Sequence, residues 1–439
     1  MKRYFIGVSI LLSFSAALAA QNPIFLSRAY NSDPQARVWT IQGEPSPRLF
    51  VYGSSDDDPS YYCSKHYDVF STEDMIHWTG GRSFSSSEVP YNDEMLYAPD
   101  CIEKDGKYYL FYSQSGGGSV EGTAVSDSPY GPFGDGRPLE GAGQIDPSVF
   151  SDDDGQAWLF WGQFSAKCAR LNPDMRSIDP STIKDGIITE KEHHFHEGIQ
   201  AFKHNGTYYL VFADISRRGM PTCLGYATSD KVTGPYKYRG VIIDNYGCDP
   251  SVWNNHGSVV RFKDRWYVFY HRSTCGTVTM RNSCAEPIEI LPDGTIPEVE
   301  MTSTGAGLPL DPYLQLGKDP VAGRACLLHG HVRIDRNSHL DGIRDNDMAA
   351  WKDFDFKQAP GKMLISVCPK AGGTIDVYSE YLYGHTLASF EIPPGDGKSF
   401  ITLEAKVEED LTGVLPIRMR FQGEADKDLF VLGGFSFSK

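Results

Sequence analysis

Residues 146–162, DPSVFSDDDGQAWLFWG, combine a short strand, a turn rich in Asp and Gly, and a second strand rich in aromatic side chains. This order is typical of a β-hairpin. Three further segments repeat it: YAPDCIEKDGKYYLFYS at 97–113, EGIQAFKHNGTYYLVFAD at 197–214 and HGSVVRFKDRWYVFYHR at 256–272. A degenerate first copy runs from Asp33 to RLFVYGSS at 48–55. The chain therefore holds five copies of one hairpin.

The copies recur at a nearly constant interval. Their aligned aromatic residues are separated by 59, 49, 51 and 58 residues (Phe50, Tyr109, Trp158, Tyr209 and Tyr267). A period of this size in a strand-rich chain is typical of a β-propeller with one four-stranded blade per repeat. We therefore predict an all-β fold, with a five-bladed β-propeller over residues 22–318.

The first strand of each copy begins with a residue at a matching offset. Tyr97, Asp146 and Glu197 lie twelve residues before their aligned aromatics, and His256 lies eleven residues before its own. Asp33 stands at the start of the first copy. In a propeller, equivalent positions of the inner strands converge on one axis. We therefore expect Asp33, Asp146 and Glu197 to surround one cavity.

The composition narrows the class of partner. The 439 residues carry a formal net charge of −16, and 13% of them are aromatic. A negative surface repels nucleic-acid backbones, whose binding needs clustered Lys and Arg, so no nucleic-acid partner is expected. Acidic polysaccharides are disfavoured for the same reason unless a local basic pocket exists. The aromatic content suits a β-protein that stacks on sugars.

The first twenty residues read as a secretory signal peptide. Two basic residues precede an apolar stretch over 5–18, and small alanines follow it. These are the three parts of a cleavable signal. Cleavage before Ala20 and cleavage before Gln21 fit equally well. Because the apolar run is shorter than the ~20 residues of a spanning helix, we predict export to the periplasm or the outside, without membrane insertion.

Nine cysteines remain in an exported chain, where disulfides are permitted. The number is odd, so at least one thiol is left over. Cys275 and Cys284 flank one short loop and form the most plausible local bridge, while buried free thiols are an equally good reading. No CxxC spacing occurs, and we expect no zinc site.

From about Gly305 the pattern changes. The Gly- and Pro-rich stretch at 305–320 reads as a connection. Short alternating segments follow, such as KMLISVCP at 362–369 and FVLGGFSFS at 430–438. They are typical of a small β-sandwich. We therefore predict a second, β-sandwich domain at 319–439.

The repeats resemble glycoside hydrolase family 43, whose enzymes are five-bladed β-propellers. SDPQARV at 32–38 is similar to the segment that carries the family's general base. The hairpins from 97, 146 and 197, and NHGSVV at 255–260, follow in the family's order, with Tyr97 where the family commonly has Trp. The resemblance covers about residues 22–300. The tail is more loosely similar to a family 6 carbohydrate-binding module.

The resemblance implies roles for three carboxyl groups. Asp33 would be the general base, Glu197 the general acid, and Asp146 the group that helps Glu197 to keep its proton. The family inverts configuration, so a water must fit between base and acid. We therefore expect Asp33 and Glu197 to be separated by roughly 6.5–9.5 Å. Asp249, in a second DPSV, is assigned no catalysis, and Asp100 is assigned a structural role.

The resemblance also implies residues around the sugar. Arg281 matches a family arginine that contacts the substrate, and Arg272 competes for that role. His256 would lie beneath the site, near water or a calcium ion that is compatible with the resemblance but not required. Tyr97 and Trp39 are expected either to stack on a sugar face or to pack within the blades.

Three histidines just before Glu197 resemble a metal cluster on paper. They lack matching acidic ligands, so we expect solvated or packing roles for them (His193, His194 and His196). The chemistry of two carboxyl groups and a water needs no redox or nucleotide cofactor. We therefore expect no metal ligands and no required cofactor.

These features together predict an exported, monomeric, inverting glycoside hydrolase. It would release α-L-arabinofuranosyl or β-D-xylosyl units from plant cell-wall polysaccharide. The alternatives are a galactan- or galactofuranose-directed hydrolase of the same family, a non-catalytic carbohydrate-binding propeller and a structural interaction propeller. The exact sugar, exo or endo action and the ligand of the C-terminal domain stay open.

Overall fold

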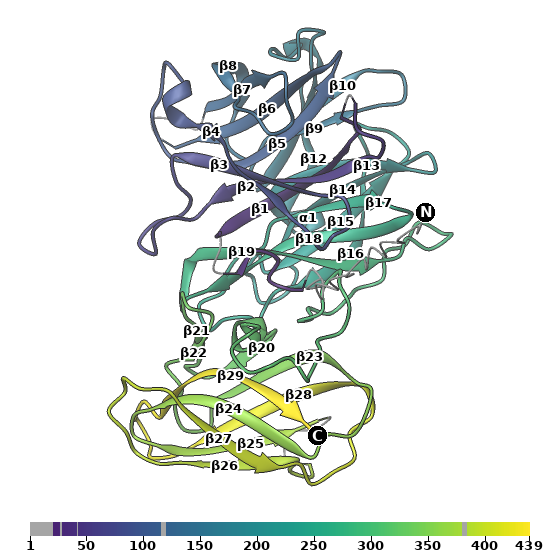
Figure 1. The fold of residues 1–439 in the computed structure, drawn as a ribbon. Coiled ribbons are helices and arrows are strands. Elements are labelled where there is room, and N and C mark those ends of the chain that lie inside the picture. The colour runs from purple at the N-terminus through teal and green to yellow at the C-terminus, as the bar shows by residue number, and fades with distance from the viewer. Residues whose placement is uncertain (1–20, 27–28, 42, 116–119, 380–383) are drawn as a thin grey trace, which may run out of the picture.

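The computed structural model describes residues 21–439 except 27–28, 42, 116–119 and 380–383. The predicted signal peptide therefore lies outside the described residues. Within the described ranges, no helix is long and apolar enough to cross a membrane. The described residues form five sheets around one axis, followed by two packed five-stranded sheets (Figure 1). The prediction of an all-β fold with a five-bladed β-propeller and a β-sandwich is confirmed.

Each blade is an antiparallel meander whose first strand lies nearest the axis. The strands are β1 (Asn31–Trp39), β2 (Arg48–Ser55), β3 (His66–Thr72) and β4 (Thr79–Ser85) in blade 1; β5 (Leu96–Lys104), β6 (Lys107–Gln114), β7 (Val120–Ser126) and β8 (Gly134–Gly143) in blade 2; β9 (Ser148–Ser151), β10 (Ala157–Trp161), β11 (Ser165–Arg170) and β12 (Lys184–Thr189) in blade 3; β13 (Phe195–His204), β14 (Thr207–Asp214), β15 (Cys223–Ser229) and β16 (Lys237–Asp244) in blade 4; and β17 (Ser258–Phe262), β18 (Arg265–Thr274) and β19 (Thr277–Ile288) in blade 5. Short helical turns are η2 (Ser86–Glu88), η3 (Pro180–Thr182) and α1 (Glu190–His193).

The inner hairpins form because their turn residues accept left-handed backbone angles. Both loop residues have positive φ at Asp105–Gly106, Asn205–Gly206 and Lys263–Asp264. Two-residue loops of this kind are type I′ turns, whose twist matches that of the strands they join. In blade 3 the loop is one residue longer, because Asp152 N bonds to Gln156 O across it at 3.0 Å.

The five first strands, β1, β5, β9, β13 and β17, contact one another in a closed ring. Polar side chains bond across the blade boundaries at one level. Asp100 of β5 accepts from the Ser148 hydroxyl of β9 at 2.9 Å. Gln200 of β13 bonds to both backbone groups of Val259 in β17. Ser258 of β17 donates to a backbone carbonyl of β1 at 2.8 Å. These bonds hold the axial ends of the strands in register.

The segment at residues 21–25 closes the ring between the last and the first blade. The Asn22 side chain donates to Ala285 O of β19 at 3.2 Å and accepts from Ala285 N at 2.9 Å. The Phe25 ring packs on Phe70 of blade 1, with ring centroids 4.1 Å apart. The N-terminal segment therefore clamps the three strands of blade 5 against blade 1.

The C-terminal domain consists of two sheets packed face to face. In sheet order the first contains β20 (Leu327–His329), β23 (Met348–Phe356), β28 (Gly413–Gln422), β25 (Gly373–Tyr378) and β26 (Ala388–Ile392), and the second contains β21 (Arg333–Ile334), β22 (Leu340–Asp341), β29 (Phe430–Ser438), β24 (Lys362–Pro369) and β27 (Ile401–Lys406). The short turn η4 (Val321–Arg324) precedes them. Buried apolar side chains of alternating strand residues, such as Trp351 and Ile365, fill the space between the sheets.

The sandwich begins earlier along the chain than the predicted boundary between residues 318 and 319. Leu310 forms a parallel bridge to Phe354 of β23, and its side chain lies in the sandwich core. The Gly- and Pro-rich connection therefore packs along the sandwich and is not a separate linker between the domains. The apolar side chains of Leu310, within the connection, and of Val321, just after it, lie in the sandwich core.

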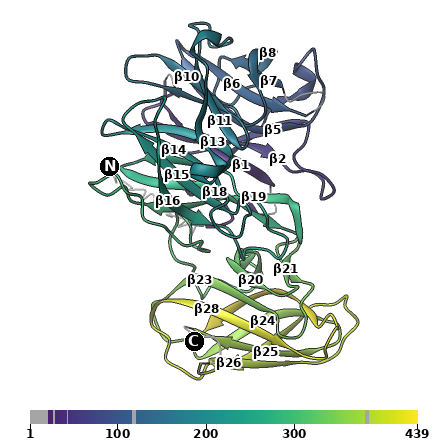
Figure 2. The same ribbon diagram turned by 180° about the vertical axis from the view of Figure 1, so that it is seen from behind.

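The two domains meet through blade 5 and the start of the sandwich. Both views place β20 and β21 at this junction (Figure 1, Figure 2). Leu328 N of β20 donates to Gly247 O at 2.6 Å. The fully buried Arg272 of β18 donates from Nη1 to Ala325 O at 3.1 Å. Arg272 therefore stabilises the domain junction and does not reach the axis.

All nine cysteines lie in the described part of the chain and are free thiols. Cys275 Sγ contacts Tyr30 Oη at 3.5 Å, and Cys284 Sγ accepts from Arg272 Nε at 3.1 Å. Both cysteines are therefore free thiols and not a bridged pair: Cys284 is buried, and Cys275 is partly buried.

Candidate active site

Hairpin pairing fixes which residues reach the axis at one level. Asp33, Ala98, Asp146, Gly198 and His256 each lie two residues before an equivalent paired position in their first strands. Glu197 precedes this level by one residue, because the longer loop of blade 3 shifts the count from the aligned aromatic. Four of the five residues at this level have left-handed φ, between 35° and 66°. In these four blades the chain therefore bends where the first strand meets the axis.

Asp33 lies near the start of β1 and is 4% exposed. Its Oδ1 accepts from Arg281 Nη1 at 2.9 Å, and its Oδ2 accepts from Ser54 Oγ at 2.7 Å. Burial alone would raise the pKa of Asp33, but the charge of Arg281 lowers this pKa well below its usual range. Asp33 is therefore ionised over the neutral range, as a general base must be.

The His271 ring holds the backbone of Asp33 in place. Its Nδ1 accepts from the Asp33 backbone N at 3.2 Å, and its Nε2 faces Asn254 Oδ1 at 3.1 Å. These two partners fit a neutral ring with the proton on Nε2. Burial lowers the pKa of His271, which favours the same neutral form.

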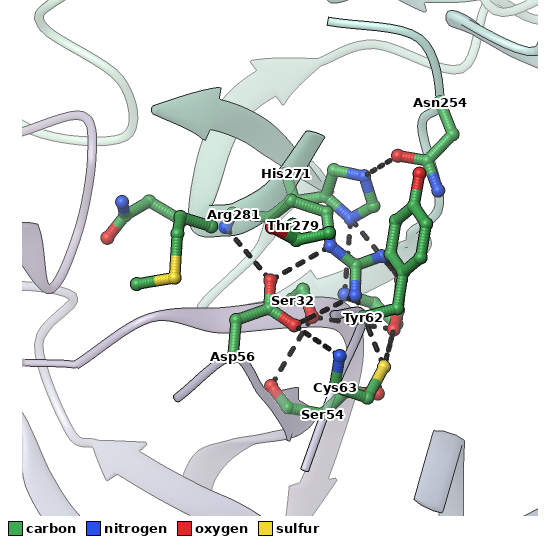
Figure 3. A network of polar contacts seen from close by, with 12 residues as sticks. Ser32, Ser54, Asp56, Tyr62, Cys63, Asn254, His271, Thr279 and Arg281 are labelled. Carbon is green, nitrogen blue, oxygen red and sulfur yellow. Dashed lines mark hydrogen bonds and ion pairs between the residues drawn. The ribbon is translucent and has the colours of Figure 1, made fainter. Parts of the chain in front are cut away.

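Arg281 of β19 joins the two acids of the first blade. Its Nε and Nη2 donate to the two carboxylate oxygens of Asp56 at 2.9 and 3.0 Å, while Nη1 donates to Asp33 Oδ1. Figure 3 shows the guanidinium between Asp56 and the ring of Tyr62, whose centroid lies 5.2 Å from Cζ. Cys63 Sγ accepts from Nη2 at 3.2 Å. A planar fork held on several sides is rigid enough to fix the position of a sugar hydroxyl.

Asp146 and His256 lie beside Asp33. His256 Nδ1 is 3.9 Å from Asp33 Oδ1 and 4.0 Å from Asp146 Oδ2. Burial, then the neighbouring carboxylates of Glu197 and Asp33, raise the pKa of Asp146 well above its usual value. Gly198 makes this packing possible, since a Cβ on it would lie 2.8 Å from His256 Nδ1. Asp146 is therefore the carboxyl group that takes up a proton, while Asp33 stays charged.

Glu197 lies at the start of β13, and its side chain is 13% exposed. Gln163 Nε2 donates to Glu197 Oε2 at 2.8 Å. His196 Nε2 lies 4.0 Å from the same oxygen, while its Nδ1 faces Glu190 Oε1 at 3.0 Å. Glu197 is thus the more accessible acid, oriented by an amide.

The structure does not bring the predicted stacking residues together. Trp39 ends β1, six residues beyond Asp33, and its ring packs edge-on against Tyr108 at 6.0 Å. At about 3.3 Å per residue that position is about 20 Å from the base, so Trp39 is a packing residue between blades. Tyr97 lies one residue before the axial level, and its Oη is 3.2 Å from that of Tyr61. Tyr97 therefore lies next to the axial level, in contact with Tyr61.

Local contacts account for Asp249, His193 and His194. Asp249 caps a turn by accepting from Ser251 N at 2.9 Å. His193 Nδ1 accepts from Thr189 N at 3.1 Å, and the His194 ring packs on Tyr238. Asp100 bridges blades, as described above.

Among the described residues, no group of three or more His, Cys, Asp and Glu side chains is arranged to hold a metal ion. Calcium takes six to eight oxygen ligands. Near His256 the structure places two carboxyl groups, and that of Asp33 is already bonded to Arg281. The residues present do not form a calcium cage there.

Sequence reasoning missed four members of the site: Asp56, Cys63, Gln163 and His271. Asp56 follows β2 in the acidic run SSDDD, and His271 stands in YHR at the end of a repeat. Their positions in strand ends were visible in the sequence. Their convergence was not, because it depends on how blades 1 and 5 meet.

Around the axis the structure therefore brings together a buried carboxylate, a second carboxyl group that favours its proton, and a partly accessible glutamate. A charged carboxylate that can act as a base and a glutamate that can act as an acid are the groups needed to cleave a glycosidic bond. A propeller with these acids at its axis is thus typical of a glycoside hydrolase.

The sequence profile described as glycosyl hydrolases family 43 matches residues 50–296. A xylosidase/arabinosidase of Thermoclostridium stercorarium is 32% identical over 89% of this chain and 86% of its own. A solved β-xylosidase/α-arabinofuranosidase of the same family, from a compost microbial metagenome, is 28% identical with a TM-score of 0.55, covering 64% of this chain and 97% of its own. The chain belongs to glycosyl hydrolases family 43.

The two-domain arrangement also has a counterpart. A family 43 arabinoxylan arabinofuranohydrolase from Bacillus subtilis has a TM-score of 0.53 and covers 96% of this chain and 99% of its own. At 24% identity this likeness concerns the fold. It extends over the propeller and the sandwich together.

Proposed function

We propose that this chain is an inverting glycoside hydrolase that releases α-L-arabinofuranosyl or β-D-xylosyl units from plant cell-wall polysaccharide. One observation carries the proposal: Asp33 is held as a carboxylate by Arg281, while Glu197 lies accessible beside the proton-binding Asp146. The named activities of the xylosidase/arabinosidase relatives support the choice of sugar.

In the proposed reaction, Asp33 accepts a proton from water as the water attacks the anomeric carbon. Glu197 donates a proton to the glycosidic oxygen as the bond to that oxygen breaks. Asp146 favours retention of a proton on the pair that it forms with Glu197, because two close carboxylates resist double ionisation. Arg281 holds Asp33 and keeps one Nη1 hydrogen for a sugar hydroxyl.

The product's stereochemistry tests the proposal. The substrate is the aryl arabinofuranoside, xyloside or galactofuranoside that purified protein cleaves fastest. Proton NMR of the first-formed sugar should show the opposite anomeric configuration to the substrate, because water attacks in a single displacement. Asp33→Asn should lower kcat by at least about a thousandfold, since an amide cannot accept the proton.

Retained configuration, or a sugar ester trapped on any carboxyl group, would contradict the assignment of Asp33 as base. Turnover of the galactofuranoside alone would redirect the proposal to the alternative substrate class. Wild-type and variant protein should unfold at similar temperatures, so that lost turnover reflects chemistry.

The remaining parts of the proposal concern context. We propose export after removal of residues 1–20, action as a monomer, and carbohydrate binding by the C-terminal sandwich. The reaction uses proton transfers and water, so it requires no cofactor, and calcium near His256 is not part of it. Activity should accordingly survive extensive dialysis against EDTA.

A further inference from the structure

A short loop beside Glu197 has features that the fold alone does not require. Residues 162–164 join β10 to β11, and Gln163 within them bonds to Glu197. Gly162 N donates to Ile145 O at 2.9 Å, next to Asp146. Phe164 N donates to His196 O at 2.7 Å, next to Glu197. The loop is therefore fixed to the chain on both sides of the acid pair.

Phe164 is held in a strained conformation with its ring in solvent. Its φ is +62°, in the left-handed region that bulky residues rarely adopt. The side chain is 51% exposed, and the ring meets the His196 ring edge-on at 5.1 Å. Glycine would satisfy this backbone without strain. Single exposed apolar residues need no explanation, but strain retained beside an active site does point to function.

The ring lies on the side of the acid. A general acid protonates the oxygen between the two sugars, so the sugar of the leaving group lies beyond that oxygen, near the acid. In the proposed reaction, water attacks from the opposite side with Asp33 as its base. The Phe164 ring contacts His196, whose Nε2 lies 4.0 Å from Glu197 Oε2, so the ring lies near the carboxyl group that would protonate that oxygen.

We propose that Phe164 is the platform on which the sugar of the leaving group stacks, and so a specificity-determining residue for polymeric and oligomeric substrates. The inference rests on the proposed function. A flat aromatic face matches the apolar face of a pyranose ring, and a rigid ring loses little entropy on binding. The strained loop keeps that face presented before substrate arrives.

Two substrates with the same glycone separate this role from general damage. One is an arabinosylated or unbranched xylo-oligosaccharide, and the other is the methyl glycoside, which has no leaving sugar to stack. Both have poor leaving groups and depend on Glu197 equally. Phe164→Gly suits the left-handed backbone, so the loop should keep its shape. It should lower kcat/KM for the oligosaccharide about threefold to tenfold more than for the methyl glycoside.

Control variants complete the test. Phe164→Tyr should restore the wild-type ratio of the two kcat/KM values, while Phe164→Leu, which is apolar but not flat, should not. Tyr246→Ala removes another exposed aromatic, one that packs on Arg218, and should leave the ratio at its wild-type value. Equal losses on both substrates, or no loss on the oligosaccharide, would overturn the inference. Failure of wild-type protein to cleave either substrate would instead overturn the proposed function.

Discussion

Asp33 and Asp146 are buried to nearly the same extent, with side chains 6% and 7% exposed, yet their pKa values move in opposite directions. Burial raises both. Only Asp33 has a guanidinium at 2.9 Å to reverse the effect, whereas Asp146 faces other carboxyl groups. A single arginine therefore decides which of two neighbouring aspartates acts as a base.

This assignment predicts a shift in pH dependence. In the wild-type protein Asp33 stays ionised into acid, because Arg281 holds its pKa down. In Arg281→Gln the burial is no longer opposed, so the pKa of Asp33 rises and its basic form is lost at higher pH. The acid limb of kcat/KM against pH should move upward by roughly 1–3 pH units. Arg281→Lys keeps the charge without the fork and should shift it less.

An acid limb that stays in place in Arg281→Gln would show that another group limits activity at low pH. Thermal unfolding of each variant, measured over the same pH range, would separate loss of the folded protein from loss of the base.

At the scale of the element, the repeated hairpins could be predicted because each carries its own turn chemistry and aromatic strand. The position of each residue along the axis could not be predicted. One added residue in the loop at 153–155 changes the distance in sequence between the aligned aromatic and the residue that reaches the axis. Counting from the aromatic placed Glu197 level with Asp146, whereas pairing places Gly198 there. Stacking and packing aromatics such as Trp39 are also alike in sequence, because both roles need the same apolar surface.

Asp100 links neighbouring blades, so its substitution should lower the stability of the propeller. Its buried carboxylate accepts from Arg37 Nε at 2.9 Å and from Val149 N at 2.8 Å, linking three blades. Asp100→Asn places a donor against those donors and removes the charge that Arg37 needs. It should lower the free energy of unfolding by about 3 kcal/mol, measured by chemical denaturation. Asp105→Asn, in an exposed turn that Asn tolerates, is the matched control and should change stability by less than about 0.5 kcal/mol.

At the scale of the whole molecule, three parts of the chain meet at one buried carboxyl group. Glu286 of β19 accepts from Asn22 Nδ2 at 2.8 Å, from Thr302 N at 2.8 Å and from Tyr270 Oη at 3.1 Å. It thus ties the N-terminal segment, blade 5 and the connection to the sandwich. The repeats and both domains were predictable from local patterns. This junction was not, since its members are scattered over 280 residues.

The junction predicts how stability depends on pH. Burial raises the pKa of Glu286 from 4.5 to about 7, and the hydrogen bonds from Thr302 and Tyr270 offset only part of that effect. Between these values the folded protein binds a proton that the unfolded chain has released, so the free energy of unfolding falls as pH rises. The contribution is about 3 kcal/mol, at 1.36 kcal/mol per unit. Glu286→Gln cannot ionise and should remove it.

Denaturation of wild type and Glu286→Gln should therefore give similar free energies of unfolding at pH 4.5, and a more stable variant at pH 7.5. Other titratable groups contribute equally to both proteins, so the difference between the two curves cancels their contributions. Glu289→Gln, at an exposed position of the following segment, should leave the pH dependence as it is. Parallel curves for wild type and Glu286→Gln would mean that its hydrogen-bond donors keep Glu286 ionised. The molecule would then be held together at this point by charge-assisted hydrogen bonds at every pH.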